Sequence, residues 1–261
     1  MLWSYSRLTA FEDCPYRYYL RYIAEAGKTD KFYAEYGTLM HSMISEYLTD
    51  YDVTEDDIVD DYIYDFYDML DRVEGIPSYR KTILSYYNDG LSYLSDIQLP
   101  DGKVKDVERR FFFPVEGEQF QGIIDLLLKQ NDGGYVIVDH KSRKLKPRSS
   151  RGKPTLNDKE IDEKKRQLYL YSAAVKNEYG ECPTALYLNC FRVPLLIKES
   201  FDFDKYNEAV KWAKRTIESI SEASIEDFKP RIDQFKCTYI CSVSESCEYY
   251  KDFVEGGRRN M

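Results

Sequence analysis

An acid and a lysine end an apolar, β-branched segment of the chain, VIVDHKSRK at residues 136–144. Side chains of a strand alternate between its two faces, so Asp139 and Lys141 should share a face. Tyr135 and Ile137 belong to the same face. A carboxylate binds hard metal ions, and a lysine beside it can hold a phosphate oxygen or the attacking water. The spacing therefore predicts that this strand brings one metal ligand and one cation to the same point.

A second acid, Asp125, stands inside the apolar sequence GIIDLLL at residues 122–128. Alternation would place it on one face together with Gln121, Ile123 and Leu127. The segment is typical of a strand buried on both sides, where a carboxylate is costly unless it is paired or bound to a metal. We therefore predict an ion-pair or metal-binding role for Asp125; the alternative is an acid in water at the end of a strand.

The two acids are expected to face each other. A tight turn centred near Asp132 would place Asp125 opposite Asp139, with Cβ atoms about 4.5–5.5 Å apart. Carboxylates that close repel each other unless a cation lies between them. Hard oxygen ligands suit Mg²⁺ or Mn²⁺, so the pair predicts a site for one of these ions.

The elements that must position these residues follow from hydrophobic periodicity and from turn and cap residues. Helices are predicted over 7–24 with an interruption at Pro15, 37–49, 54–73, 78–96, 158–179 with Gly180 after it, and 203–222. Strands are predicted over 103–115, 119–130, 135–141, 184–193 and 195–201. This order favours an α/β domain built on a mixed sheet, with a helical subdomain over 37–99.

The composition is that of a globular protein, since 43% of the 261 residues are hydrophobic and 32% are charged. The first twenty residues lack the basic and apolar regions of a secretory signal, and the longest apolar runs are too short to span a bilayer. We expect a protein of the cytoplasm, or of the host cytoplasm if a phage encodes it, with no membrane partner.

The charge of the chain is unevenly distributed, although it sums to −9. Residues 50–74 hold eleven acids and one base, whereas residues 141–153 hold seven bases and no acid. A local basic patch can bind phosphates whatever the net charge of the protein. The stretch 141–153 is therefore a candidate phosphate-binding loop; the alternative is an ordinary solvated loop.

Together these residues resemble the D-x(n)-(D/E)-x-K core of the PD-(D/E)xK nuclease superfamily. GTLMH at 37–41 and QLYLY at 167–171 are similar to motifs of its RecB-like branch. CPYRYYLRY near the start, with a cysteine cluster near the end, is similar to the iron–sulfur subgroup of that branch. This subgroup includes the AddB nuclease domain and CRISPR-associated and phage exonucleases. The resemblance covers nearly the whole chain and implies a restriction-endonuclease-like fold.

The resemblance also implies roles for single residues. Ligands of the metal would be His41, Asp125, Asp139 and the backbone carbonyl of His140. The catalytic set would be Asp125, Asp139, Lys141 as the catalytic lysine, Gln167 to position the water or Lys141, and Tyr171 to support the site. Gln167 and Tyr171 are four residues apart and so share a helix face. A lone histidine on a helix is more often structural, so the assignment of His41 depends on the order of the motifs.

Six cysteines are present, and three of them form the sequence CTYICSVSESC. Four thiolates, from Cys14, Cys237, Cys241 and Cys247, would suit a 4Fe–4S cluster or Zn²⁺. Their one-plus-three arrangement across the chain resembles the iron–sulfur subgroup. Cys182 and Cys190 are interpreted as ordinary residues. A zinc-stapled binding module remains an alternative, and free thiols are a poor explanation of so dense a cluster.

The sequence thus predicts one nuclease domain over 1–261. Its expected parts are a helical insert over 41–100, a catalytic α/β core over 103–201, and an iron–sulfur region over 1–25 and 228–250 that joins the termini. The expected reaction is metal-dependent hydrolysis of DNA, by resemblance at single-stranded ends, with Lys144, Lys146 and Arg148 on the DNA backbone. The main alternative is a non-catalytic nucleic-acid-binding or scaffold subunit. Recombination, repair or CRISPR-adaptation proteins are candidate partners.

Overall fold

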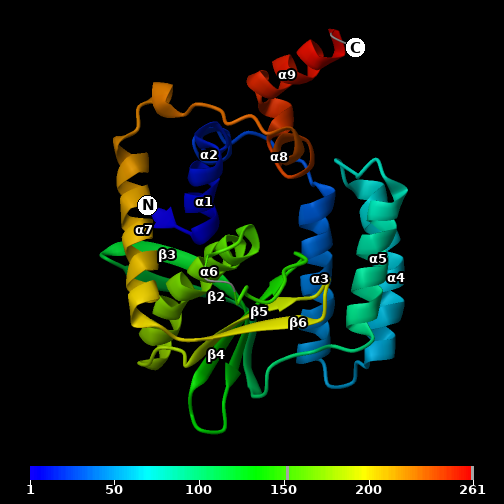
Figure 1. Ribbon diagram of the computed structural model, residues 1–261, viewed down its shortest axis with the longest axis vertical. Coiled ribbons are helices and arrows are strands. Elements are labelled where there is room, and N and C mark those ends of the chain that lie inside the picture. Colours follow the sequence, from blue (N-terminus) through cyan, green and yellow to red (C-terminus); the bar gives the residue numbers. More distant parts are fainter. Residues whose placement is uncertain (151–152, 260–261) are drawn as a thin grey trace.

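A mixed β-sheet lies between two groups of helices (Figure 1). The computed structural model describes residues 1–150 and 153–259, without the side chains beyond residue 253. Residues 151–152 of the predicted basic loop and 260–261 of the predicted domain lie outside the described residues. The strands are β1 (Leu2–Trp3), β2 (Lys103–Val115), β3 (Glu118–Lys129), β4 (Tyr135–Lys141), β5 (Ala185–Cys190) and β6 (Leu195–Ser200).

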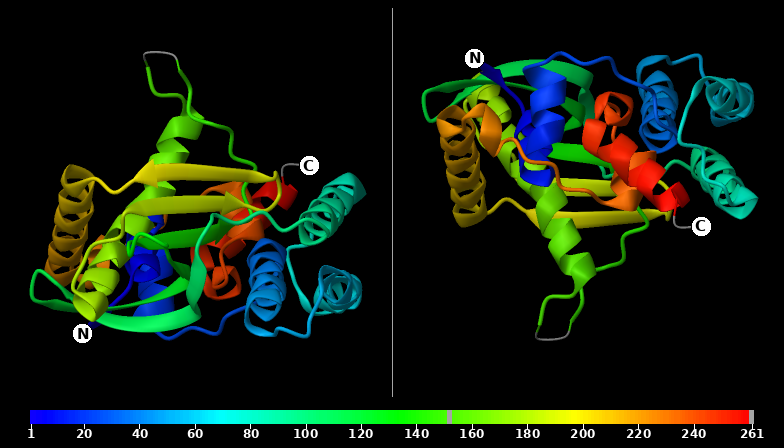
Figure 2. Two further views of the ribbon diagram at one scale, coloured as in Figure 1. Left: turned by 90° about the horizontal axis from the view of Figure 1, so that it is seen from below. Right: turned by 90° about the horizontal axis from the view of Figure 1, so that it is seen from above.

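The helices follow the predicted order along the chain. They are α1 (Tyr5–Asp13), α2 (Pro15–Tyr22), α3 (Phe32–Thr49), α4 (Glu55–Arg72), α5 (Arg80–Leu94), α6 (Leu156–Tyr179), α7 (Phe203–Glu222), α8 (Gln234–Tyr239) and α9 (Glu248–Arg259). In Figures 1 and 2, α7 stands at one end of the sheet and α3, α4 and α5 stand at the other. None of the helices in the described part is long and apolar enough to cross a bilayer.

The sheet has the order β1-β3-β4-β5-β6, with β2 paired to β3, and it confirms the predicted mixed sheet. β3 is antiparallel to β2 and to β4, whereas β4 and β5 run parallel. Parallel neighbours need a long crossover connection, and α6 provides it between β4 and β5. Because β4 and β5 lie inside the sheet, the acid and the lysine at the end of β4 are placed at its centre.

Caps in the sequence fix both ends of α6. The side chain of Thr155 accepts from the backbone N–H of Asp158, and the carboxylate of Asp158 accepts from that of Thr155, which forms a capping box. Gly180 ends the helix with φ 80°, in the left-handed region that glycine adopts readily. Leu168 and Leu170 are among the residues of this helix that are buried in the main core cluster.

The helical insert begins earlier than predicted. The helix expected over 37–49 begins at Phe32, although its N-cap residue, Lys31, makes no capping side-chain hydrogen bond. Burial explains the difference, because Phe32 and Tyr36 are fully buried in an aromatic cluster formed by α3, α4 and α5. The helices approach closely: a Cβ at Gly90 would lie 2.3 Å from the hydroxyl oxygen of Tyr62. This packing holds α3, the helix that carries His41.

The predicted alternation of β3 is wrong at Asp125. Strict alternation would place Ile124 and Leu126 on one face, but Ile124 packs in the core beneath α6 and Leu126 packs on the opposite face. Ile123, expected on the face of Asp125, is exposed. Across from Asp125 in the register, Glu108 of β2 has φ 47°. A non-glycine residue in the left-handed region breaks the regular pleat, so both strands change face here.

Candidate active site

Asp139 and Lys141 form an ion pair, with 2.5 Å between Lys141 Nζ and Asp139 Oδ2. Asp139 is only 3% exposed, and the Lys141 ammonium is the partner of its Oδ2. Burial lowers the pKa of Lys141, but Asp139 and Asp125 outweigh burial and raise it. The lysine therefore stays charged at neutral pH. As predicted from alternation, both side chains lie on the face of β4 that α6 covers.

Asp125 reaches across the gap that opens between β3 and β4. The paired register ends at Leu126 and Val138, so Asp125 and Asp139 are the next opposed positions, close to the predicted arrangement. The backbone N–H of His140 donates to Asp125 Oδ2 at 2.8 Å, where a strand carbonyl would otherwise accept. Burial, helped by the charges of Asp139 and Glu108, raises the pKa of Asp125. A cation at this point would relieve that cost.

His41 projects from α3 to the same point. Its Nδ1 lies 2.9 Å from Glu108 Oε1 and 3.8 Å from Asp125 Oδ2. One ligand atom from each of these three residues lies within 4.8 Å of the other two, the single such group of three or more among the described residues. Burial lowers the pKa of His41, but Asp125 and Glu108 outweigh burial and raise it to about 9. The acids therefore surround a position that favours positive charge.

The backbone of His140 faces this group, while its ring points away. The carbonyl oxygen of His140 lies 3.2 Å from His41 Nε2. Its ring is buried on the other face of the sheet, where His140 Nδ1 lies 3.0 Å from Asn189 Nδ2. Asn189 also donates to the hydroxyl of Tyr93 at 2.5 Å. Burial, with the charges of His41 and Lys141, lowers the pKa of His140, so the ring is neutral. Asn189, which is itself held by Tyr93, thus anchors the ring of His140.

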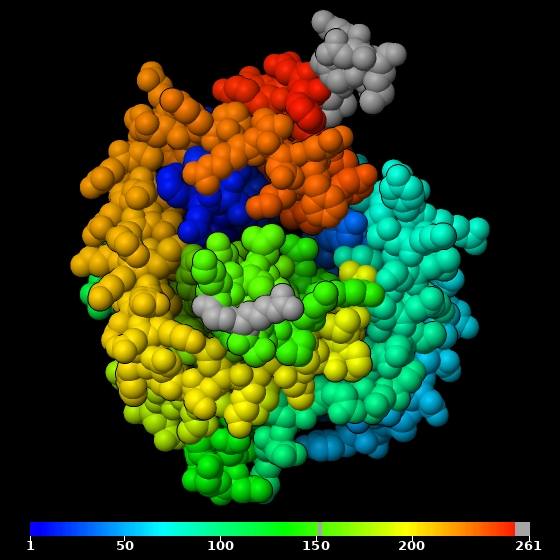
Figure 3. Space-filling view, in the orientation of Figure 1, coloured from blue at the N-terminus to red at the C-terminus, as the bar shows by residue number. Residues whose placement is uncertain are grey.

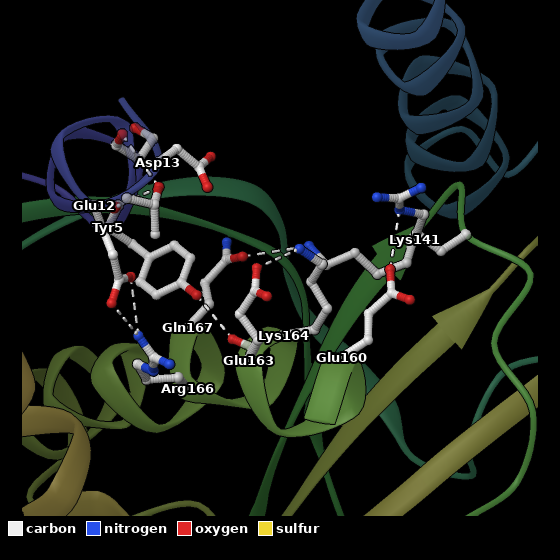
Figure 4. Close-up of polar contacts among 12 residues, drawn as sticks. Tyr5, Glu12, Asp13, Lys141, Glu160, Glu163, Lys164, Arg166 and Gln167 are labelled. Atoms are coloured by element: carbon white, nitrogen blue, oxygen red, sulfur yellow. Dashed lines mark hydrogen bonds and ion pairs between the residues drawn. The ribbon is translucent and has the colours of Figure 1, made fainter. Parts of the chain in front are cut away.

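Gln167 and Tyr171 lie on the face of α6 that covers the sheet. Lys141 Nζ donates to Gln167 Oε1 at 3.3 Å (Figure 4). Tyr171 packs over β3: a Cβ at Gly122 would lie 2.5 Å from Tyr171 Cε1. Glycine is therefore required at position 122, and the tyrosine ring fixes the distance between α6 and β3. Gln167 contacts the lysine, whereas Tyr171 contacts the strand that carries Asp125.

The arrangement combines a hard-ligand site with an adjacent buried cation. The imidazole of His41, the carboxylates of Glu108 and Asp125 and the carbonyl of His140 lie close together, and the ion pair of Asp139 and Lys141 lies beside them. The model of the PD-(D/E)XK nuclease superfamily matches residues 2–248, nearly the full length of the chain. The chain belongs to this nuclease superfamily. In the sequence of this nuclease, β4 ends in Asp139-His140-Lys141, and Asp125 lies on the preceding strand.

One solved structure extends the similarity to the fold. The nuclease is similar to a protein from Eubacterium rectale that is assigned as an exonuclease by name only, with 13% identity and a TM-score of 0.53. That match covers 96% of this chain and 87% of the other. A protein called SSO0001 is 18% identical over 93% of this chain and 85% of its own, with a TM-score of 0.36. Comparison with curated protein sequences gives no significant match.

The four cysteines of the predicted cluster line one small pocket of the nuclease. Cys14 lies between α1 and α2, and its Sγ is 3.4 Å from the backbone nitrogens of Arg17 and Arg231. Burial raises the pKa of the other three thiols, and Cys14 adds to the effect at each of them. No three of the four Sγ atoms come within 4.8 Å of one another, judged over the described residues. Tetrahedral zinc–sulfur bonds of about 2.3 Å would need shorter spacings.

Two of the three predicted DNA-binding residues already have acidic partners. Lys144 Nζ lies 2.7 Å from Asp89 Oδ2, and Arg148 pairs with Asp162 and Glu199. The side chain of Lys146 is exposed, and its backbone hydrogen-bonds to Asn157. The DNA-binding role of these residues remains a prediction.

Sequence reasoning missed Glu108, Asn189 and Tyr93. Glu108 lies in the charged strand sequence KDVERR, where no spacing distinguishes it from its neighbours. Asn189 interrupts the apolar strand ALYLNC, and a buried polar residue in such a strand is the one signal that could have identified it.

Proposed function

We propose that this nuclease cleaves DNA with a bound Mg²⁺ or Mn²⁺ ion and that it acts as an exonuclease on single-stranded ends. The observation that carries the proposal is the convergence of His41, Glu108 and Asp125 beside the ion pair of Asp139 and Lys141. The convergence argues against the alternative of a non-catalytic nucleic-acid-binding or scaffold subunit, because DNA binding alone does not need a buried carboxylate cluster.

The residues present fit a hard divalent cation. His41, Asp125 and Asp139, the predicted ligands, are joined by Glu108 and by the carbonyl of His140. Asp139 is buried, and its carboxylate, paired with Lys141, is a charged oxygen ligand that a cation can share. One nitrogen and several oxygens suit Mn²⁺ and Mg²⁺ rather than a thiophilic metal. When bound, such an ion polarises the scissile phosphate and lowers the pKa of water.

The side chains of the site have separate tasks in this reaction. Lys141, charged and held between Asp139 and Gln167, stabilises negative charge that develops on phosphate oxygen. Gln167 limits the positions of the lysine amine, and Tyr171 keeps α6 at a fixed distance from β3. The N–H of His140 fixes the carboxylate of Asp125. Preorganised charge of this kind lowers the barrier because little reorganisation is needed as the reaction proceeds.

We propose that the four cysteines hold a 4Fe–4S cluster, as the resemblance to the RecB-like branch implies. The four Sγ atoms surround one pocket, and their spacing is wider than a single zinc ion requires. This wider spacing supports a cluster rather than zinc. Bound there, the cluster would join α1 and α2 to the C-terminal segment. The proposal places the nuclease in the cytoplasm, where recombination, repair or CRISPR-adaptation proteins would be its partners.

The test is cleavage of end-labelled single-stranded and double-stranded DNA with Mg²⁺, Mn²⁺ or no added metal. The wild type should degrade the single strand progressively from an end when metal is present. Lys141→Ala should not, and Lys211→Ala on the exposed face of α7 is a matched control that should behave as the wild type. Absence of cleavage by anaerobically purified wild type under all conditions would favour the non-catalytic alternative.

A further inference from the structure

An open groove runs between α6 and α8, with a volume of about 490 Å³. We propose that this groove holds a single strand of DNA on its way to Lys141, with phosphates on its basic side chains and a base stacked on Phe235. The inference rests on the proposed function and assigns its substrate path. It places that path along α6 and α8 and shares only Arg143 with the predicted basic loop.

The position of the groove supports this path. Arg143 lines the groove and follows Lys141 by two residues, while Lys164 lines it one helical turn before Gln167. Figure 4 shows Glu160, Glu163, Lys164 and Gln167 along one side of α6, with Lys141 reaching toward Gln167. The groove is therefore lined by residues that follow Lys141 on the chain and precede Gln167 on α6. Figure 3 shows the surface of α1 and α2 between the C-terminal segment and the start of α6.

The lining of the groove is basic. Its cations are Arg17, Arg143, Lys159, Lys164 and Lys236, and its acids are Asp13, Glu160 and Glu163. Arg143 pairs with Glu160 at 3.1 Å, and Lys236 pairs with Asp13 at 3.3 Å. Exposed pairs such as these contribute little free energy, so a phosphate can take the place of the acid. Lys159 is exposed and has no ion pair among the described residues.

Phe235 gives the groove a preference for unpaired bases. Its side chain is 46% exposed at the start of α8 and is supported from behind by Tyr33 and Tyr239, with ring centroids 5.6 and 5.4 Å away. A rigid, exposed ring between cations is the arrangement on which bases of single strands stack. Bases in a duplex are already stacked on each other, so they cannot use this ring. The groove therefore fits a single strand.

The same geometry gives the cysteine site a role in substrate binding. Cys237 follows Lys236 directly on α8. A cluster bound by the cysteines would therefore also fix the position of α8, the wall of the groove that carries Phe235 and Lys236. The second wall, on α6, is fixed by the sheet. Binding should therefore weaken when the cysteine site is lost, even if the metal site of the catalytic centre is intact.

The first experiment measures binding of fluorescein-labelled oligothymidylate by anisotropy, with the full chain carrying Lys141→Ala so that cleavage does not interfere. Adding Phe235→Ala should weaken binding about tenfold, the effect of one lost base stack. Phe235→Trp should retain it. Phe203→Ala is the matched control, because Phe203 is 61% exposed at the start of α7 and packs on one ring, Phe201. Circular dichroism should show that all variants are folded.

The second experiment removes charge. Arg143→Ala, Lys159→Ala and Lys236→Ala together should reduce the slope of log K against log salt by about two, since each phosphate contact of a single strand contributes about 0.7. Lys211→Ala should leave the slope unchanged. Unchanged affinity and slope in the groove variants would overturn the inference even if wild type cleaves DNA. If wild type does not cleave but the groove variants lose binding, the nuclease proposal fails, and the groove is a single-strand binding site that leads to no cleavage.

Discussion

Glu108 and Asp125 occupy opposed positions on β2 and β3, and both carboxylates turn to the same ring nitrogen of His41. The backbone of Glu108 adopts φ 47° to do so, a conformation that costs a non-glycine residue about 1–3 kcal/mol. Strain of this kind persists only where the surrounding structure imposes it. The face change of the two strands therefore serves to gather the acids around the histidine.

Glu108→Gln is expected to weaken Mn²⁺ binding at least about tenfold, because it removes one carboxylate charge from the site. Isothermal calorimetry would measure the affinity. Glu108→Gly should weaken binding similarly, yet the metal-free Gly variant should unfold at no lower temperature than the Gln variant, because glycine adopts positive φ without strain. A much less stable Gly variant would show that the backbone at this position is not strained.

Asp139→Ala and Lys141→Ala should both lose cleavage, for different reasons. Removing Asp139 deletes a predicted ligand, so Mn²⁺ affinity should fall together with activity. Removing Lys141 should reduce the single-turnover rate by about 10²–10³ while leaving most metal affinity, because one stabilising charge is lost. Calorimetry beside single-turnover cleavage separates the two cases. Cleavage near the wild-type rate by either variant would contradict their assignment as the catalytic pair.

Asn189→Leu should disturb the site from the opposite face of the sheet. The ring of His140 would lose its buried partner, at a cost of about 1–3 kcal/mol in stability. The carbonyl of His140 would then be held less firmly, and Mn²⁺ affinity should fall more than it does in Tyr93→Phe, which leaves the contact between Asn189 and His140 in place. Equal metal affinity in Asn189→Leu and wild type would limit Asn189 to a structural role.

Because of Glu199, we expect the protein to lose stability in acid. Burial raises its pKa, but hydrogen bonds from Lys165, Lys205 and Tyr169 outweigh burial and hold the pKa at about 2. Because the pKa of Glu199 is lower in the folded protein than in the unfolded chain, the ionised carboxylate stabilises the fold. This stabilisation is fully present above the ordinary pKa of 4.5 and is lost as the pH falls toward 2. The contribution is on the order of 3 kcal/mol. Urea unfolding at several pH values measures it.

The Glu199→Gln variant should be compared with wild type over the same range of pH. It should be less stable than wild type at pH 7, because Lys165 is 2% exposed and would lose its counter-ion. Its further loss between pH 4.5 and pH 2 should be smaller than that of wild type, since the group that titrates is gone. Parallel losses in both proteins would assign the acid sensitivity to other carboxylates.

If the cysteines hold a 4Fe–4S cluster, anaerobically purified protein should be brown and contain about four irons per chain. Cys241→Ala should lose the iron and the colour and should melt at a lower temperature, because the N-terminal and C-terminal segments are then no longer joined. Cys182→Ala is the control, since Cys182 lies apart from the pocket that the other four line. Stoichiometric zinc and no iron in anaerobic wild type would contradict the iron–sulfur proposal.

The sequence by itself determined the elements and the residues that local pattern marks. Apolar runs bounded by turn residues defined β2, β3 and β4, while Thr155 and Gly180 are cap residues that fix the ends of α6. The approach of Asp125 to Asp139 also followed from the sequence, because a short turn leaves little freedom in the register of a hairpin. These features depend on neighbours within a few residues, and a single sequence contains that information.

Only the tertiary structure decided which side chains join the site from a distance. Glu108 reaches His41 because two strands change face together, and Asn189 reaches His140 through the pairing of β4 with β5. Lys144, which is predicted to contact DNA, pairs with Asp89, and only the fold shows that α5 presents this acid to it. The physical reason is that burial and pairing energies belong to contacts between segments far apart in the chain. Periodicity shows that a face is buried, but it does not show against what.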